Sequence, residues 1–197
     1  MDNHSILIVE DELITAESIA ELLEAEGYTL AGIAKDAATA LRICSGPEGV
    51  PAVVICDINI KGNVNGTALA SQLKELYHCE IIFLTAYADR INLQAAFCSN
   101  PVMYVVKPYS VTQLLVAVQM AFHKMYEKDK AAADSPFQLT ARESEIICLI
   151  GRGLTTKQIA HQLGITAETV KTHRKRMLQK HNVGSIARLV YLAGGGS

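Results

Sequence analysis

The chain has 197 residues, of which 50% are hydrophobic and 19% are charged, and its formal net charge is −2. This composition excludes an intrinsically disordered chain, and the length suits one large or two small domains with their own cores. Residues 137–197 hold nine of the 18 Lys and Arg residues but only three of the 20 acidic residues. A polyanionic partner is therefore expected for the C-terminal part alone.

The first 125 residues alternate short apolar runs with longer amphipathic segments. The apolar runs are continuous rather than alternating, which is typical of parallel strands buried on both faces. This pattern predicts an α/β fold: a doubly wound (βα)5 parallel-sheet domain over residues 1–126. The expected strands are 5–9, 28–33, 52–56, 80–85 and 102–106, and the expected helices are 13–26, 36–44, 66–77, 90–98 and 110–126.

Polar residues stand at the ends of four of these strands. Glu10 and Asp11 follow the first strand, Asp57 closes the third, Thr85 the fourth and Lys107 the fifth. Parallel strands bring their carboxyl ends to one edge of the sheet, where such folds bind ligands. Each residue alone would more often be a solvated loop residue, but their joint placement predicts one site.

A magnesium-dependent phosphoryl-accepting site needs a pair of acids, a single Asp, a hydroxyl group and a Lys, and these strand ends supply all of them. Asp57 is the candidate nucleophile, with Lys107 pairing with the phosphoryl group and Thr85 donating its hydroxyl to it. The predicted Mg²⁺ ligands are the carboxylates of Glu10, Asp11 and Asp57 and the main-chain carbonyl of Asn59.

Residues 4–126 resemble the receiver domain of bacterial two-component response regulators. The resemblance rests on four segments: Ile6 to Glu12, Cys56-Asp57-Ile58, Phe83-Leu84-Thr85-Ala86, and Val106-Lys107-Pro108-Tyr109. It implies that Asp57 accepts a phosphoryl group from a sensor histidine kinase or from a small donor such as acetyl phosphate. It also implies a cis Lys107–Pro108 bond.

The same resemblance implies that Thr85 and Tyr104 form a switch pair, although a core-filling role fits Tyr104 equally well. The chain departs from the family in two places. It lacks the Pro that often stands just ahead of the Gly at the position of Gly66, and it carries the bulky Tyr87 beside the site. Tyr87 is expected to slow the attack of water on a phosphorylated Asp57.

Residues 127–136 are charged, then small, and are broken by Pro136, which predicts a linker. Capping boxes at Thr140 and Thr155 and a cap at Thr166 begin three further helices, and a fourth is expected at 185–192. With a Gly-containing turn between the second and third, this pattern predicts an all-α four-helix helix-turn-helix domain over 137–193. Residues 194–197 have the composition of an added tail.

The third of these helices is strongly basic between residues 168 and 180, although charge alone would also fit a solvated helix. The segments at 139–143, 153–160 and 165–173 resemble the LuxR-type helix-turn-helix, so the whole chain resembles a NarL/FixJ-type response regulator. The implied partner is double-stranded DNA with an inverted-repeat operator, bound by a homodimer that forms through the last helix. The resemblance places Lys171, Thr172 and Lys175 at base edges, and Thr156, Lys157 and Arg174 or Arg176 at backbone phosphates.

The five cysteines show no C-x-x-C spacing, which favours reduced, mostly buried thiols, and the six His residues show no zinc-ligand spacing. Without a signal or membrane segment the chain is predicted to be cytoplasmic.

The chain is expected to act as a phosphorylation switch and not as an enzyme that turns over a substrate. An aspartate-dependent phosphatase is disfavoured because Asn59 stands where its second acid belongs. A phosphate-independent DNA-binding protein with a receiver scaffold remains an alternative, and the receiver could cover the recognition helix or hold the dimer apart.

Overall fold

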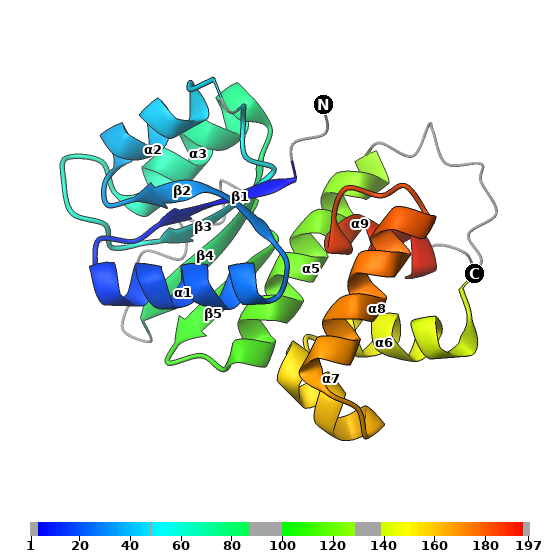
Figure 1. Ribbon diagram of the computed structural model, residues 1–197. Coiled ribbons are helices and arrows are strands. Elements are labelled where there is room, and N and C mark those ends of the chain that lie inside the picture. Colours follow the sequence, from blue (N-terminus) through cyan, green and yellow to red (C-terminus); the bar gives the residue numbers. More distant parts are fainter. Residues whose placement is uncertain (1–3, 48, 87–99, 129–138, 195–197) are drawn as a thin grey trace.

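The computed structural model describes residues 4–47, 49–86, 100–128 and 139–194, and its N-terminal part is built around a five-stranded parallel sheet (Figure 1). The strand order is β2-β1-β3-β4-β5. All neighbouring pairs are parallel, so the polar residues at the strand ends gather at one edge. The strands are β1 (Ser5–Val9), β2 (Thr29–Ala34), β3 (Val53–Asp57), β4 (Glu80–Ala86) and β5 (Met103–Lys107).

Helices cover both faces of the sheet. Alternate residues of β1 face opposite sides, because successive strand side chains point in opposite directions. Ile6 and Ile8 pack in one hydrophobic cluster, whereas Leu7 and Val9 pack in the other. The first cluster is covered by α1 (Leu13–Ala25) and α5 (Val111–Lys128), and the second by α2 (Ala37–Cys44) and α3 (Gly66–Tyr77). The predicted doubly wound fold is confirmed; the helix expected at 90–98 lies outside the described residues.

Four helices form the C-terminal part: α6 (Ala141–Gly151), α7 (Thr156–Leu163), α8 (Ala167–Lys180) and α9 (Ile186–Gly194). Thr140 and Thr155 form complete capping boxes at the starts of α6 and α7. Thr166 caps α8 by accepting a hydrogen bond from the Thr169 N–H. Gly164 ends α7 in the left-handed conformation at φ +64°, which glycine adopts without strain. The predicted helix-turn-helix arrangement is therefore confirmed.

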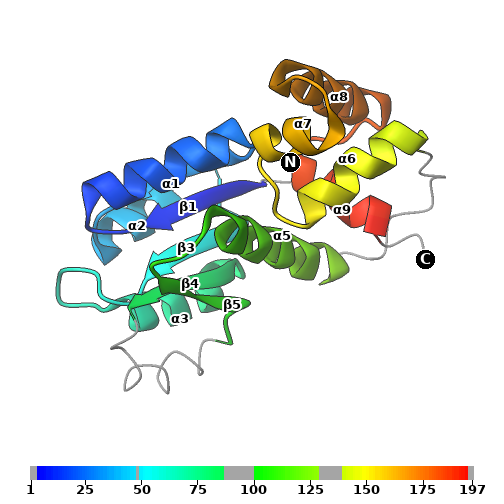
Figure 2. The ribbon, with the colours of Figure 1, turned by 90° about the horizontal axis from the view of Figure 1, so that it is seen from below.

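The two parts of the chain pack closely against each other, with α5 between the sheet and the C-terminal helices (Figures 1 and 2). One continuous cluster of buried side chains extends from β1 through α5 into α6, α8 and α9. Tyr126 of α5 and Tyr191 of α9 lie with ring centroids 5.3 Å apart. The Tyr126 hydroxyl also forms hydrogen bonds with His4 at 2.9 Å and with Ser185 at 3.1 Å. The two parts thus share one apolar core.

The boundaries differ from the sequence predictions by a few residues. Helix α5 continues to Lys128, into the predicted linker, and Gly194 belongs to α9 rather than to the tail. The rest of the linker up to residue 136 lies outside the described residues. Three cysteines are buried as expected, but Cys148 is exposed, and Cys98 lies outside the described part. In the ranges that the structure describes, no helix is long and apolar enough to cross a membrane.

Candidate functional site

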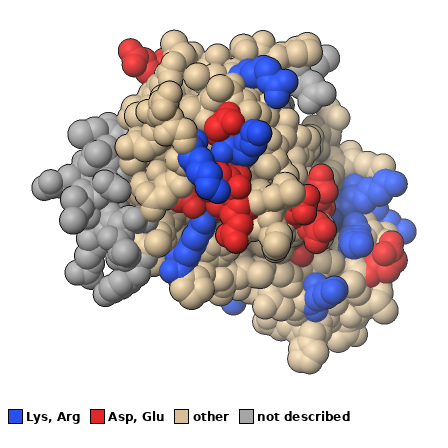
Figure 3. Space-filling model, turned by 90° about the vertical axis from the view of Figure 1, so that its left-hand side faces the viewer, with Lys and Arg blue, Asp and Glu red and all other residues tan. Residues whose placement is uncertain are grey.

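The carboxyl edge of the sheet forms an acidic crevice. Acidic side chains gather in the middle of this face, with Lys side chains beside them (Figure 3). The parallel register explains the gathering. Asp57 pairs with Leu84 of β4, the residue before Thr85, and Lys107 pairs with the neighbouring Ala86. The strand pairing therefore brings together residues that are up to 97 positions apart in the chain.

Lys107 is the centre of this crevice. Its ammonium nitrogen lies 2.6 Å from Glu10 Oε2 and 2.5 Å from Asp57 Oδ2. Glu10 is only 2% exposed and Asp57 only 8%, and burying two carboxylates is costly unless a cation compensates them. The Lys107 ammonium supplies that cation, and charge-assisted hydrogen bonds of this kind are strong.

Burial and the neighbouring charges shift the pKa values of Glu10 and Lys107. Burial raises the pKa of Glu10 above its usual value, and the negative charge of Asp57 adds to this, while the hydrogen bond from Lys107 opposes it. Burial by itself would lower the pKa of Lys107, but the hydrogen bonds and charges of Asp57 and Glu10 together raise it. Lys107 therefore stays a full positive charge beside the two carboxylates.

Asp11, the third predicted acid, takes a different partner. Its carboxylate lies 2.9 Å from the ammonium of Lys61, which belongs to the segment after β3. Within the described part of the chain, no three His, Cys, Asp or Glu side chains are arranged to hold a metal ion. The oxygen donors nonetheless match the chemistry that Mg²⁺ prefers. In this structure the carboxylates of Glu10 and Asp57 pair with the Lys107 ammonium, and that of Asp11 pairs with the Lys61 ammonium.

Backbone contacts fix the position of Asp57. The Asn59 N–H donates to Asp57 Oδ1 at 2.9 Å, so Asn59 lies against this carboxylate. Gly66, the first residue of α3, packs on the other side: a Cβ at this position would lie only 1.9 Å from the Asp57 carbonyl oxygen. The start of α3 can approach β3 this closely only because residue 66 has no side chain.

The predicted switch residues lie next to the crevice. Thr85 is 4% exposed. The ring of Tyr104 on β5 stacks on Phe83, with centroids 5.6 Å apart, and its hydroxyl oxygen is buried. The Lys107–Pro108 bond is cis, as the family resemblance implies. Tyr87, the other residue singled out from the sequence, lies outside the described residues.

The predicted DNA-contacting residues of α7 and α8 divide into two groups. Lys157, Lys171, Lys175 and Arg176 are exposed and Thr172 is half-buried, as expected of a surface that binds a polyanion. Thr156 and Arg174 are instead buried, at 4% and 8% exposure. The two candidate phosphate contacts Arg174 and Arg176 thus differ in exposure: Arg176 is exposed, whereas Arg174 is buried.

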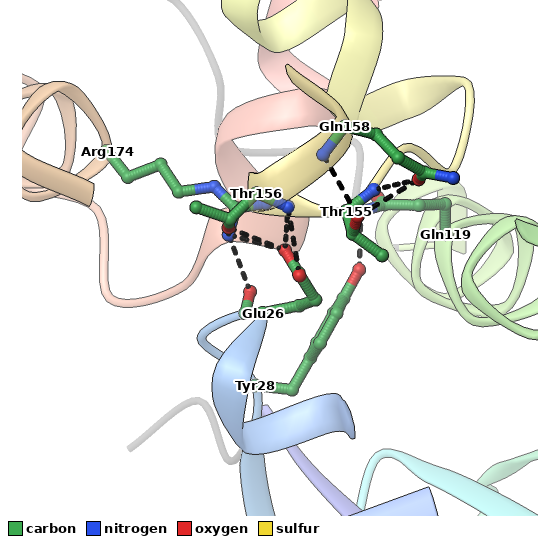
Figure 4. A network of polar contacts seen from close by, with 7 residues as sticks. All are labelled: Glu26, Tyr28, Gln119, Thr155, Thr156, Gln158 and Arg174. Atoms are coloured by element: carbon green, nitrogen blue, oxygen red, sulfur yellow. Dashed lines mark hydrogen bonds and ion pairs between the residues drawn. The ribbon is translucent and has the colours of Figure 1, made fainter. Parts of the chain in front are cut away.

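Thr156 and Arg174 are buried by Glu26 at the C-terminal end of α1 (Figure 4). The Thr156 N–H donates to both Glu26 carboxylate oxygens, at 2.9 and 3.0 Å. The Thr156 hydroxyl donates to Glu26 Oε2 at 2.8 Å, and Arg174 Nη1 donates to the same oxygen at 2.9 Å. Arg174 Nη1 also donates to the Thr156 hydroxyl at 2.8 Å, which closes the network.

Sequence reasoning did not single out Lys61 as a partner of Asp11 or Glu26 as a partner of the C-terminal helices. The position of Glu26 carried a weak signal, because an acidic side chain at a helix C-terminus opposes the helix dipole. Its partners lie 130 and 148 residues further along the chain. No local pattern predicts contacts at such separations.

Two family models match the chain: "Response regulator receiver domain" over residues 6–119 and "Bacterial regulatory proteins, luxR family" over residues 137–193. Transcriptional regulatory protein LiaR of Bacillus subtilis is 27% identical over 194 residues, with 90% of each chain covered. The low-resolution structure of response regulator StyR has a TM-score of 0.54 and 29% identity, covering 97% of this chain and 98% of that one. RcsB of Salmonella enterica, solved bound to promoter rprA, has the same TM-score at 21% identity, covering 98% and 99%.

Proposed function

The chain belongs to the response regulator family, as a transcriptional regulator with a receiver domain followed by a LuxR-type helix-turn-helix domain, and we propose that phosphorylation of Asp57 controls its binding to DNA. The observation that carries this proposal is the pairing of Lys107 with both Glu10 and Asp57 at the carboxyl edge of the sheet. This pairing places a nucleophile, a second carboxylate and a fixed cation within hydrogen-bonding distance of one another.

In the proposed reaction, Asp57 Oδ attacks the phosphorus of the donor, and the bond from phosphorus to the leaving group breaks. The donor is a phosphohistidine of a sensor kinase or a small acyl phosphate such as acetyl phosphate. Lys107 shifts from the carboxylates to the phosphoryl oxygens and neutralises the charge that gathers there. Thr85 donates its hydroxyl to one of these oxygens.

Mg²⁺ would be held by the carboxylates of Glu10, Asp11 and Asp57 and by the main-chain carbonyl of Asn59. The ion supplies positive charge that screens the incoming phosphoryl group from these acids. Asp11 must leave Lys61 to join this set. A hollow of about 630 Å³, lined in part by Lys35 and Lys61, lies beside Asp11 and offers an anionic donor an approach to the crevice.

The signal would leave the crevice through Thr85 and Tyr104. Movement of the Thr85 hydroxyl toward the phosphoryl group would free space behind it. Tyr104 already stacks on Phe83 next to this space. A shift of its ring would disturb β5, which α5 contacts from the other face of the sheet, and α5 is the helix on which α9 packs. Phosphorylation would thereby weaken the hold of the receiver on the C-terminal helices, by shifting an existing equilibrium.

Once released, the helix-turn-helix domain would bind double-stranded DNA as a homodimer at an inverted repeat, with α9 in the dimer interface. We propose that Lys171, Thr172 and Lys175 face base edges and that Lys157 and Arg176 contact phosphates. The protein would work in the cytoplasm, where its kinase and DNA partners meet.

The decisive test is the intact mass of the protein after incubation with acetyl phosphate and Mg²⁺, with Asp57→Asn as the matched control and chelation of the metal as a second control. The proposal expects the mass of one phosphoryl group on the wild type only, and only with Mg²⁺. Duplex DNA binding, measured by fluorescence anisotropy on the same samples, should increase with the phosphorylated fraction.

Other outcomes point to other functions. Continuous release of inorganic phosphate without stable labelling would favour an aspartate-dependent phosphatase. DNA binding that is unchanged by acetyl phosphate and by a purified phosphorylated histidine kinase would favour the phosphate-independent scaffold.

A further inference from the structure

The contact between Glu26 and the helix-turn-helix domain has the form of a filled anion site. The Glu26 carboxylate of the receiver accepts hydrogen bonds from three groups. These are the main-chain N–H and the hydroxyl of Thr156, the first residue of α7, and a guanidinium N–H of Arg174 on α8. Glu26 is 5% exposed, so these donors have replaced water around its charge. The capping box of Thr155 and Gln158 satisfies other groups at the start of α7 and leaves the Thr156 N–H for this anion.

These donors would suit a larger anion at least as well as the carboxylate. A helix N-terminus carries a partial positive charge and free N–H groups, and this combination commonly binds phosphate. Arg174 adds a full positive charge that a planar guanidinium can share between two oxygens. The Arg174 Nε atom is buried and finds no hydrogen-bond acceptor among the described residues. Glu26 therefore leaves one donor of the site unused.

We propose that Thr156 and Arg174 form a binding site for a phosphodiester group of duplex DNA, and that the Glu26 carboxylate is an intramolecular mimic of that phosphate. This inference rests on the proposed function, that the C-terminal domain binds DNA. The Glu26 carboxylate oxygens would be the atoms through which the receiver prevents DNA binding. The pocket can hold Glu26 or a DNA phosphate but not both, so closure and backbone binding exclude each other at this point.

The charges of the site make the exclusion specific. Arg174 is buried, and a buried guanidinium without an anion is costly. The closed form compensates it with Glu26, and the DNA-bound form would compensate it with a phosphate. Lys157 and Arg176 stay exposed while the pocket is filled. The closed protein thus keeps weak, sequence-independent contacts with DNA but lacks the contact that fixes α7 on the backbone.

The test compares unphosphorylated full-length proteins binding a labelled random-sequence duplex, by fluorescence anisotropy over a series of KCl concentrations. A random sequence is suitable because phosphate contacts do not depend on base sequence. Glu26→Gln keeps the shape of the side chain and can still accept from Thr156, but it leaves Arg174 without its counter-charge. Glu24→Gln is the matched control, since Glu24 lies two residues away on the exposed side of α1 and loses the same charge.

We expect Glu26→Gln to bind the duplex about tenfold more tightly than wild type, because loss of the counter-charge favours opening. The slope of log affinity against log salt should steepen by about 0.9, the value for one additional neutralised phosphate. Glu24→Gln should behave like wild type. In the double variant Glu26→Gln/Arg174→Met, both the gain in affinity and the steeper slope should disappear, because the group that binds the phosphate is gone.

Two results would overturn the inference while the proposed function stands. In one, Glu26→Gln and Glu24→Gln change affinity equally, so that only overall charge matters. In the other, the double variant binds as tightly as Glu26→Gln alone, so that Arg174 contacts no phosphate. Failure of every protein to bind duplex DNA at low salt, before and after acetyl phosphate treatment, would instead overturn the proposed function itself. Circular dichroism melting of each variant verifies that the proteins compared are folded.

Discussion

The ammonium of Lys61 lies 2.9 Å from the carboxylate of Asp11. This pair involves one of the three acids proposed to hold Mg²⁺, and the Lys61 side chain is 84% exposed. The hydrogen bond and charge of Asp11 raise the pKa of Lys61, so the ammonium stays protonated throughout the neutral range. Lys61 would therefore compete weakly with the proposed Mg²⁺ for the Asp11 carboxylate.

Replacing Lys61 by Met should tighten Mg²⁺ binding, measured by isothermal titration calorimetry, by about two- to fivefold, because exposed ion pairs contribute little. Lys35→Met is the control, since it removes the same charge from the same hollow. Equal gains in the two variants would assign the effect to overall charge rather than to the pair with Asp11.

A side chain at Gly66 is expected to destabilise the fold. In Gly66→Ala the new Cβ would lie 1.9 Å from the Asp57 carbonyl oxygen, so the start of α3 or the end of β3 must move. We expect urea denaturation to report a free energy of unfolding lower by about 1–3 kcal/mol, the usual cost of overpacking. Gly194→Ala adds the same methyl group where nothing lies within 4 Å. It should change stability little, and a similar loss in both variants would contradict the packing argument.

Gly153 is where the α6–α7 loop touches the receiver. A Cβ there would lie 2.7 Å from Val116 Cγ2 and 2.8 Å from the Thr112 carbonyl oxygen, both on α5. We expect Gly153→Ala to separate the two domains, seen as faster hydrogen exchange in α5 and α9 and as a larger radius of gyration in small-angle X-ray scattering.

Gly164→Ala is a matched control for this change. Gly153 and Gly164 both have positive φ, +77° and +64°, so an Ala strains the backbone at either site. A Cβ at Gly164 meets nothing within 4 Å. This variant should lose stability without opening. Opening in both variants would show that destabilisation of the C-terminal domain, rather than the clash with α5, separates the domains.

Glu143 gives the C-terminal domain a pH-dependent contribution to stability. The hydrogen bond from the Thr140 N–H, at 2.8 Å, holds the pKa of Glu143 below its usual value, and Lys180 at 3.0 Å adds to this. A carboxylate whose pKa is lower in the folded state stabilises the fold above its unfolded pKa. That contribution is lost as the pH falls through the folded pKa.

Glu143→Gln should therefore lower the free energy of unfolding at neutral pH by about 0.5 kcal/mol, the usual size of a partly exposed helix-terminal charge interaction. Gln can still accept from Thr140, so the capping box itself is kept. Urea titrations at neutral pH and at a pH below the folded pKa test this. A difference between the variant and wild type that is the same at both pH values would exclude the charge as its source.

Much of the fold was predictable because its signals are local. Continuous apolar runs marked β1 to β5, and the boxes at Thr140 and Thr155 marked the starts of α6 and α7 within one residue. The meeting of Glu10, Asp57 and Lys107 was also predictable, because parallel strands bring their ends to one edge. The proposed roles of these residues in phosphoryl transfer remain predictions, as do the DNA contacts.

Periodicity, capping and strand-end chemistry act over a few neighbouring positions, so they were enough to predict the order of the helices and strands and to mark the candidate residues. The partners of those residues depend instead on how distant parts of the chain pack together. Asp11 pairs with Lys61, a residue that the sequence did not single out, and Arg174 rather than Arg176 turns toward the receiver. Contacts such as Glu26 with Arg174 depend on how α1, α5 and the C-terminal helices dock. Docking depends on the fit of whole buried surfaces, which no short stretch of sequence encodes.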